Sequence, residues 1–245
     1  MYWRATRYLC CCYVYLNQIR ESIRVKPMAA QVQVVTPPRK ASREHRRRQL
    51  IDATIECLAR RGYAQTTLTD VATMAGLSHG LVNFHFETKE KLLTETLLAL
   101  AAEYRDNWTR ALASVPATPE HQLEALIAAD FNQTVCTQSK LLAWCAFWGE
   151  AQSRPIYHEK CGSSDLNYIA MLEGVCDRLI ASGGYQFEAV RVARILRVVV
   201  EGLWSDIMSM NTPYPNDEAI KTAFTCAAAF FPRHFDENGL RRTAG

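Results

Sequence analysis

Residues 66–86 read TTLTDVATMAGLSHGLVNFHF, and two different folds are compatible with this sequence. Within it, GLSHG (residues 76–80) matches the G-x-S-x-G pattern of a hydrolase nucleophile elbow, with Ser78 as the nucleophile. The same letters are also typical of the turn and second helix of a helix-turn-helix that reads DNA. The two interpretations predict different structures on either side of Ser78.

The local signals around Ser78 are helical. In TLTD (67–70), a hydroxyl residue precedes a carboxylate by three positions, which is the layout of a capping box and predicts a helix over 68–75. Gly76 is suited to a left-handed turn, and Ser78 can cap a further short helix over 79–85. Because a nucleophile elbow needs a strand entering the serine turn, we interpret Ser78 as a helix cap and predict that the chain is not an enzyme and has no catalytic residue.

Helical patterns continue on both sides of this stretch. Upstream, Ile51, Ile55 and Leu58 follow helical spacing within 43–61, and Gly62 stands where a helix ends. Strand-like alternation is nearly absent. The sequence therefore predicts an all-α fold, with further helices at about 90–113, 119–135, 139–152, 155–182, 187–210 and 216–231.

Charge and cysteine content narrow the class of protein. The 245 residues are 49% apolar and carry a net charge of +3. Residues 1–50 hold 11 Lys and Arg against 2 Asp and Glu, which is a net charge of +9, so the remaining residues carry a net charge of −6. A basic end indicates a polyanionic partner such as DNA. The nine cysteines lack C-x-x-C or metal-ligand spacing, so we predict free thiols in the cytoplasm, no metal and no cofactor. No apolar run approaches the roughly 20 residues of a membrane span.

Breaks in composition suggest four segments. Residues 1–38 are expected to be a disordered or non-native extension, with Met28 as a possible true start and a signal peptide as the less favoured alternative. A helix-turn-helix domain is predicted for 39–92 and a larger helical domain for 93–235. Residues 236–245 are expected to form a flexible tail.

Residues 43–93 resemble the DNA-binding domain of the TetR family of bacterial repressors. The resemblance rests on IDATIECLARRGY (51–63), TTLTDVATMAGLS (66–78) and FHFETKEKLL (84–93). It implies a three-helix helix-turn-helix domain, followed by a helical ligand-binding and dimerisation domain whose last two helices pair with those of a second copy. Asn83 departs from the family, which often has tyrosine there, so a phosphate contact of that hydroxyl is not carried over.

The resemblance and the charge pattern together nominate DNA contacts. Candidates to contact base edges or nearby phosphates lie on the second short helix: His79, Gly80, Asn83 and His85. Phosphate contacts are expected from Thr67, Ser78 and Lys89. A basic arm precedes the first helix and continues into it: Arg39, Lys40, Arg43, Arg46 and Arg47. We expect the two phenylalanines of the second short helix, Phe84 and Phe86, to belong to the core.

The larger domain resembles the BetI-type branch of the family in LLAWCAFWGEA (141–151) and VVVEGLWSDIM (198–208). That branch represses genes for the synthesis of glycine betaine and is released from its operator by choline. A cage for a quaternary ammonium is predicted from five aromatic residues: Tyr104, Trp108, Trp144, Trp148 and Trp204. Glu201 or Asp206 would supply the counter-charge. The alternatives are that these aromatics are core residues, and that another cationic or aromatic effector controls efflux or catabolic genes.

The last helices favour a homodimer. VRVARILRVVVEGLW (190–204) and AIKTAFTCAAAFF (219–231) are apolar over more than one helical face. Such a helix can contact its own core and a second copy at once. A twofold dimer also matches an operator made of two half-sites. The predicted partners are therefore operator DNA, a small-molecule effector and a second copy of the chain, with no membrane partner.

Overall fold

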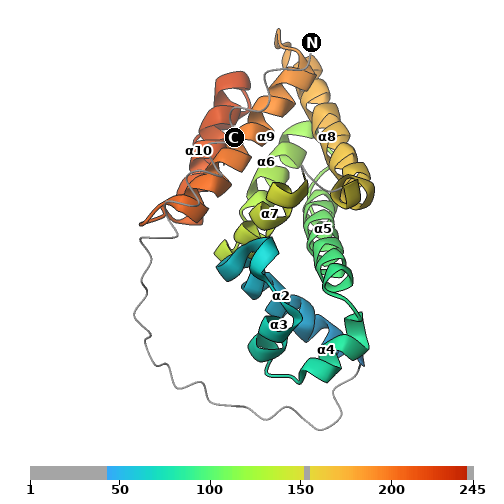
Figure 1. The fold of residues 1–245 in the computed structure, drawn as a ribbon. Helices are drawn as coiled ribbons and strands as arrows, with labels where there is room; N and C mark the ends of the chain where they lie inside the picture. The colour runs from blue at the N-terminus through green and yellow to red at the C-terminus, as the bar shows by residue number, and fades with distance from the viewer. Residues whose placement is uncertain (1–42, 152–154, 242–245) are drawn as a thin grey trace, which may run out of the picture. The chain divides into compact units, whose positions relative to one another are not determined.

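The computed structural model describes residues 43–151 and 155–241, and this part of the chain is mainly helical, as the sequence predicts (Figure 1). The helix-turn-helix consists of α2 (Arg43–Gln65), α3 (Leu68–Ala75) and α4 (His79–Phe86). The remaining helices are α5 (Lys89–Ala113), α6 (Pro119–Asp130), α7 (Gln138–Ala151), α8 (Pro155–Gly183), α9 (Ala189–Ser209) and α10 (Asn216–Phe230). None of the helices within the described ranges is long and apolar enough to cross a bilayer.

The turns of the helix-turn-helix form where the local signals predict them. Gly62 has φ +75° and ψ 176°, which interrupts the helical path of α2. Gly76 adopts the left-handed conformation at φ +65°, and its amide donates to the carbonyls at the end of α3. Because only glycine enters this region without a steric cost, these two positions set the sharp changes of direction.

A shared core holds α2, α3 and α4 together. Leu50 and Leu58 of α2 pack with Val71 of α3 and with Val82 and Phe86 of α4. The core of this domain extends to residues of α5, α7 and α8, among them Leu93, Phe147 and Cys161.

Phe84 contradicts the expectation that both phenylalanines of α4 are core residues. Phe86 is 1% exposed, whereas Phe84 is 66% exposed. The two side chains lie two positions apart, and on a helix this spacing places them on different faces. Only Phe86 therefore faces the core.

A second core fills the larger domain. On α9, buried Val192, Leu196 and Leu203 form a stripe at helical spacing, and this stripe packs in one core with Leu179 of α8 and Ala223 of α10.

Helix α6 is shorter than the sequence predicts. Helix α6 ends at Asp130 rather than at residue 135, because the chain turns at Asn132. The Thr134 amide donates to the Asn132 side chain, and the amides of Val135 and Cys136 donate to the Asn132 carbonyl.

The C-terminal segment is also more ordered than the sequence suggests. Residues 236–245 were expected to be flexible, but β1 (Phe235–Asp236) and β2 (Gly239–Leu240) form a short antiparallel hairpin. The amide of Leu240 donates to Glu124 of α6 at 2.9 Å, and the ring of Phe235 is fully buried. Burial of Phe235 and this long-range hydrogen bond explain why the segment is folded up to Arg241.

Candidate functional sites

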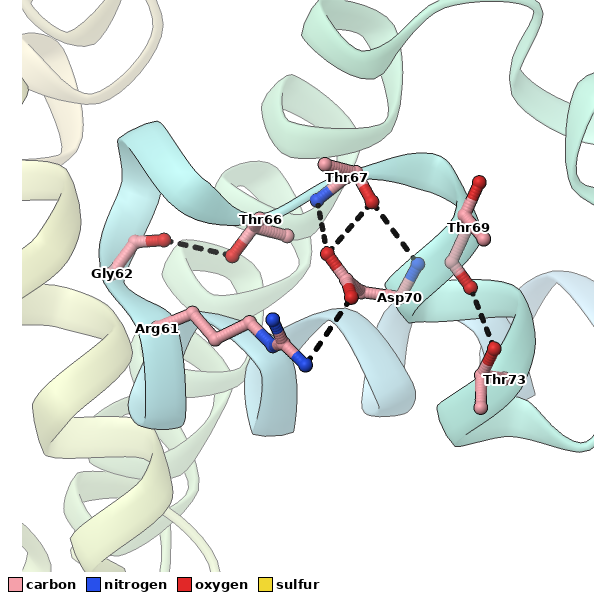
Figure 2. A network of polar contacts seen from close by, with 7 residues as sticks. All are labelled: Arg61, Gly62, Thr66, Thr67, Thr69, Asp70 and Thr73. Carbon is pink, nitrogen blue, oxygen red and sulfur yellow. Dashed lines mark hydrogen bonds and ion pairs between the residues drawn. The ribbon is translucent and has the colours of Figure 1, made fainter.

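A polar network fixes the start of α3 (Figure 2). The Thr67 hydroxyl accepts a hydrogen bond from the Asp70 amide at 3.2 Å, and the Thr67 amide donates to the Asp70 carboxylate at 3.1 Å. This is the reciprocal capping box that the sequence predicts. The second oxygen of the Asp70 carboxylate lies 3.3 Å from the guanidinium of Arg61, so the network ties the end of α2 to the start of α3.

The capping box limits what Thr67 can offer to DNA. Its hydroxyl donates to the Asp70 carboxylate at 2.7 Å while accepting from the Asp70 amide, so both of its hydrogen-bonding roles are used internally. The Thr67 hydroxyl and amide, aided by Arg61, hold the pKa of the Asp70 carboxyl below its usual value. We therefore expect phosphate at the start of α3 to be bound by backbone amides and not by the Thr67 hydroxyl.

We expect Thr67→Ala to lower the free energy of unfolding by about 1 kcal/mol, the usual cost of losing an N-cap. The matched control is Thr69→Ala, the same chemical change within the first turn of α3 at a residue whose hydroxyl does not cap the helix. Urea denaturation of both variants checks this prediction. Equal losses in the two variants would contradict the role of Thr67.

The exposed surface of α4 carries most of the predicted base-reading residues. Ser78 caps the helix by accepting a hydrogen bond from the Leu81 amide at 3.3 Å. His79, Gly80 and Asn83 are exposed, and the Asn83 amide nitrogen lies 3.2 Å from Nδ1 of His79. His79 and Asn83 thus form a hydrogen-bonded pair one helical turn apart, which restricts the orientation of both side chains.

The other predicted DNA contacts differ in how accessible they are. His85 is half-buried, and its ring lies edge-on to that of Phe84 at 5.3 Å. The Lys89 ammonium donates to the Ala64 carbonyl at 2.9 Å and lies 5.8 Å from the centre of the Tyr63 ring, so its charge is partly used within the domain. In the basic arm, Arg43 is exposed at the start of α2, with Arg46 and Arg47 half-buried, while Arg39 and Lys40 lie outside the described residues.

A group of aromatic side chains surrounds one buried carboxylate in the larger domain. The hydroxyls of Tyr104 and Tyr168 donate to the two oxygens of Asp130 at 2.8 and 3.2 Å. The Trp204 indole donates to the Asp130 backbone carbonyl at 3.1 Å, and the Trp108 ring lies 6.0 Å from that of Tyr168. We call these five residues the Asp130 cluster; they come from α5, α6, α8 and α9.

The Asp130 carboxylate lies in an environment that disfavours its negative charge. The residue is 3% exposed and is the last residue of α6, where the negative end of the helix dipole disfavours a carboxylate. Burial raises the pKa of Asp130 to about 7, although the two tyrosine hydroxyls oppose this rise. Within the described part of the chain, no Lys, Arg or His forms an ion pair with Asp130. A buried carboxylate without an internal cation, enclosed by aromatic rings, has the chemistry to bind a cation from outside.

The predicted ligand residues divide into two groups. Tyr104, Trp108 and Trp204 belong to the Asp130 cluster. Trp144 and Trp148 of α7 stack on each other at 6.1 Å, and Trp144 packs against the core of the helix-turn-helix. The structure therefore does not assemble all five aromatic residues around one cage.

Glu201 and Asp206, the carboxylates predicted as counter-charges, have partners within the larger domain. Glu201 forms an ion pair with Arg197 one turn earlier on α9, and Asp206 accepts a hydrogen bond from the Tyr214 hydroxyl at 3.1 Å. Both carboxylates already have partners, so the carboxylate enclosed by the aromatic rings is Asp130. Glu201 is nevertheless close enough to contribute to the raised pKa of Asp130.

Sequence reasoning missed two members of the cluster, Asp130 and Tyr168. Asp130 did carry a signal, because Leu123, Ile127 and Asp130 follow the i, i+4, i+7 spacing of a buried helical stripe, and a carboxylate on such a stripe is unusual. Tyr168 had no comparable signal. It shares a buried face with Leu172 and Val175, where an aromatic residue is ordinary core.

A separate open cleft of about 690 Å³ lies among α5, α6 and α10. Its lining includes several alanines, the Arg110 side chain and a single aromatic residue, Phe224. Its one carboxylate is Glu124, and none of the five members of the Asp130 cluster lines it.

A helix-turn-helix followed by a larger helical domain is the arrangement of a transcriptional regulator. Residues 50–96 match the family model of bacterial regulatory proteins of the tetR family, and residues 119–232 match the C-terminal domain of BetI-type transcriptional repressors. The chain belongs to the TetR family, as the motifs in residues 43–93 indicate. The matches are to regulators and not to enzymes, and Ser78 caps α4 in the structure. The hydrolase interpretation of Ser78 is therefore excluded.

Relatives extend the similarity over most of the chain. The regulator BetI of Escherichia coli O157:H7 is 27% identical over 168 residues, which cover 68% of this chain and 84% of that protein. A transcriptional regulator of Pseudomonas aeruginosa PAO1 superposes with a TM-score of 0.67 at 27% identity, over 79% of this chain and 93% of that one. A regulator of Saccharomonospora viridis, solved in complex with choline, shares the fold with a TM-score of 0.66 at 17% identity, over 81% and 100% of the two chains.

Proposed function

We propose that the protein is a homodimeric repressor that leaves its operator when a quaternary ammonium compound, with choline as the first candidate, binds at the Asp130 cluster. The observation that carries this proposal is the buried Asp130 carboxylate, which is enclosed by aromatic rings and forms no ion pair with a cation of the described residues. The regulated genes would then be those that make glycine betaine from choline.

The chemistry of the cluster suits this class of ligand. A quaternary ammonium has no hydrogen to donate, so it is recognised by aromatic faces and by a nearby negative charge. Tyr104 lies 5.6 Å from the Tyr168 ring and 6.0 Å from the Trp204 ring, so three rings meet beside one carboxylate. Because these rings contact one another, a bound cation has to part them, which displaces the helices that carry them.

The relatives support the same ligand class. The Saccharomonospora viridis regulator, which has this fold, was solved in complex with choline. The family model that matches residues 119–232 is that of BetI-type repressors. The alternative is a regulator of efflux or catabolic genes that responds to a different cationic or aromatic effector. That alternative would use the same cluster, since a carboxylate and three aromatic rings also suit an aromatic amine.

The exposed faces of α9 and α10 support a homodimer. Ile195, Val198 and Gly202 are exposed on α9 at helical spacing, opposite its buried stripe. On α10, residues 222–230 contain no charged side chain, although Thr222, Thr225 and Ala229 are exposed. Exposed Arg191 and Arg194 lie at the N-terminal end of this α9 surface, and the rest of it is apolar. An apolar surface on two adjacent helices is typical of an interface between identical subunits.

A contact between α7 and the end of α2 offers a route from effector to DNA. The Tyr63 ring lies edge-on to Phe147 of α7 at 5.9 Å. Lys89, at the start of α5, is placed beside the same Tyr63 ring and bonds the adjacent Ala64 carbonyl. Since α5 also carries Tyr104 and Trp108, a displacement of α5 at the cluster would reach this contact.

We expect Tyr63→Leu to reduce the effect of choline on operator affinity several-fold while leaving choline affinity itself within about 2-fold, because coupling and binding are separate free energies. Tyr63→Phe, which keeps the ring, should behave like the wild type. Operator titrations with and without saturating choline, together with calorimetry of choline binding, check this. A Tyr63→Leu variant with full coupling would show that the signal takes another route.

A gel-shift experiment with DNA from upstream of the gene tests the proposed function. We expect a shift at low salt that choline and tetramethylammonium reverse and that 3,3-dimethylbutan-1-ol, the uncharged analogue of choline, does not. Absence of any shift would reject the repressor. A shift indifferent to both ammonium compounds would reject this ligand class, and reversal by the neutral alcohol would show that charge is not recognised.

A further inference from the structure

The exposed phenylalanine of α4 has no role in the core of its domain. Phe84 is 66% exposed, although burial of a phenyl side chain is strongly favourable and large apolar residues are usually enclosed. Its ring lies edge-on to that of His85, with 5.3 Å between ring centres and 82° between planes. An apolar ring therefore lies on the surface of the helix that is expected to enter the DNA.

The neighbours of Phe84 on the helix surface leave room for a ligand. Gly80 lies one turn before Phe84, and a Cβ atom placed at Gly80 would meet nothing within 4 Å. His79 and Asn83 are also exposed on α4, and their side chains contact each other at 3.2 Å. The surface therefore combines a polar pair with a phenyl ring beside a glycine, where a DNA group can approach closely.

We propose that Phe84 is a specificity-determining residue that selects thymine at one position of each operator half-site by contacting the C5 methyl group. This inference rests on the proposed function, in which α4 lies in the major groove. The thymine methyl is the apolar group that a base pair presents in that groove. Phenylalanine has no donor or acceptor, so opposite cytosine it would cover the N4 amino group without a hydrogen bond, which disfavours that base.

Deoxyuridine substitution tests the proposal, because deoxyuridine pairs like thymidine but lacks the C5 methyl. After footprinting has located the operator, each thymidine is replaced in turn and the dissociation constant is measured for the wild type, Phe84→Ala and Met74→Ala. Met74 is the matched control, because it is an apolar side chain on the neighbouring helix α3 that is 37% exposed. Thermal melts and binding to unrelated DNA at low salt check that each variant is folded.

We expect one thymidine per half-site at which loss of the methyl weakens wild-type binding roughly 3- to 10-fold, the scale of one buried methyl group. The same substitution should have no effect on Phe84→Ala and its full effect on Met74→Ala. The proposal is overturned if no thymidine is sensitive, if the sensitivity persists in Phe84→Ala, or if Phe84→Ala weakens all sequences equally. Failure to bind any upstream DNA at low salt would instead reject the proposed repressor function, and this inference with it.

Discussion

Asp130→Asn is expected to weaken choline binding by roughly 100-fold while leaving operator affinity without choline unchanged, because truncating one member of a buried charge pair removes several kcal/mol of binding energy. Asparagine keeps the size of the side chain and can accept a hydrogen bond from Tyr104 or Tyr168, so the aromatic rings should stay in place. Calorimetric titration with choline measures the loss, and a gel shift without choline measures operator affinity.

Glu201→Gln is the matched control, because Glu201 is ion-paired with Arg197 and side-chain exposure of 41% allows solvent to screen its charge. We expect it to change choline affinity by less than about 3-fold. If Asp130→Asn binds choline as tightly as the wild type, or if Glu201→Gln shows the larger loss, Asp130 is not the counter-charge.

The raised pKa of Asp130 also predicts how choline binding depends on pH. The cation requires the ionised carboxylate, and burial raises the pKa of Asp130 to about 7. Choline affinity should therefore rise between about pH 6 and pH 8 in the wild type and remain nearly flat in Asp130→Asn. Titrations at several pH values across this window check the slope, and a wild-type affinity that falls with pH would contradict it.

The same shift affects stability without ligand. A carboxyl whose folded-state pKa is raised holds a proton that the unfolded chain releases, so its stabilising contribution is present at acid pH and is lost as the pH rises through about 7. The unliganded wild type should consequently melt at a lower temperature at pH 8 than at pH 6. Asp130→Asn should reduce this difference, which thermal melts at the two pH values can measure.

Val198→Asp is expected to weaken operator binding by roughly 100-fold or more by preventing dimerisation, since a monomer engages one half-site and loses the advantage of linked binding. Val198 is 52% exposed on α9, within the apolar surface assigned to the dimer. A carboxylate there would face its own copy across a twofold axis, which adds repulsion to the cost of desolvation.

Leu166→Asp provides the matched control, because Leu166 of α8 is 66% exposed and lies outside the α9 and α10 surface. Light scattering should show a dimer for the wild type and for Leu166→Asp, and a monomer for Val198→Asp. A dimeric Val198→Asp variant, or a monomeric wild type that still binds a two-half-site operator tightly, would contradict this interface.

Local chemistry was sufficient for the helix-turn-helix. The capping pair Thr67 and Asp70 lies within one helical turn, and the left-handed Gly76 follows directly after the helix that it ends. Interactions over three or four residues depend little on the rest of the fold, so these positions could be recognised without a structure. The exposure of Phe84 was not recognised, because an apolar residue on a short helix is usually buried.

The proposed effector site could be located only from the tertiary structure. Trp144 and Trp148 share a helical face at i, i+4 spacing, but spacing along one helix does not reveal which neighbouring helix that face meets. Tyr104 and Asp130 are 26 positions apart, and Trp204 is 74 positions from Asp130, yet packing of α5, α6 and α9 brings all three together. Periodicity therefore established the helices, their caps and their apolar faces, whereas long-range packing decided which carboxylate the aromatic rings enclose.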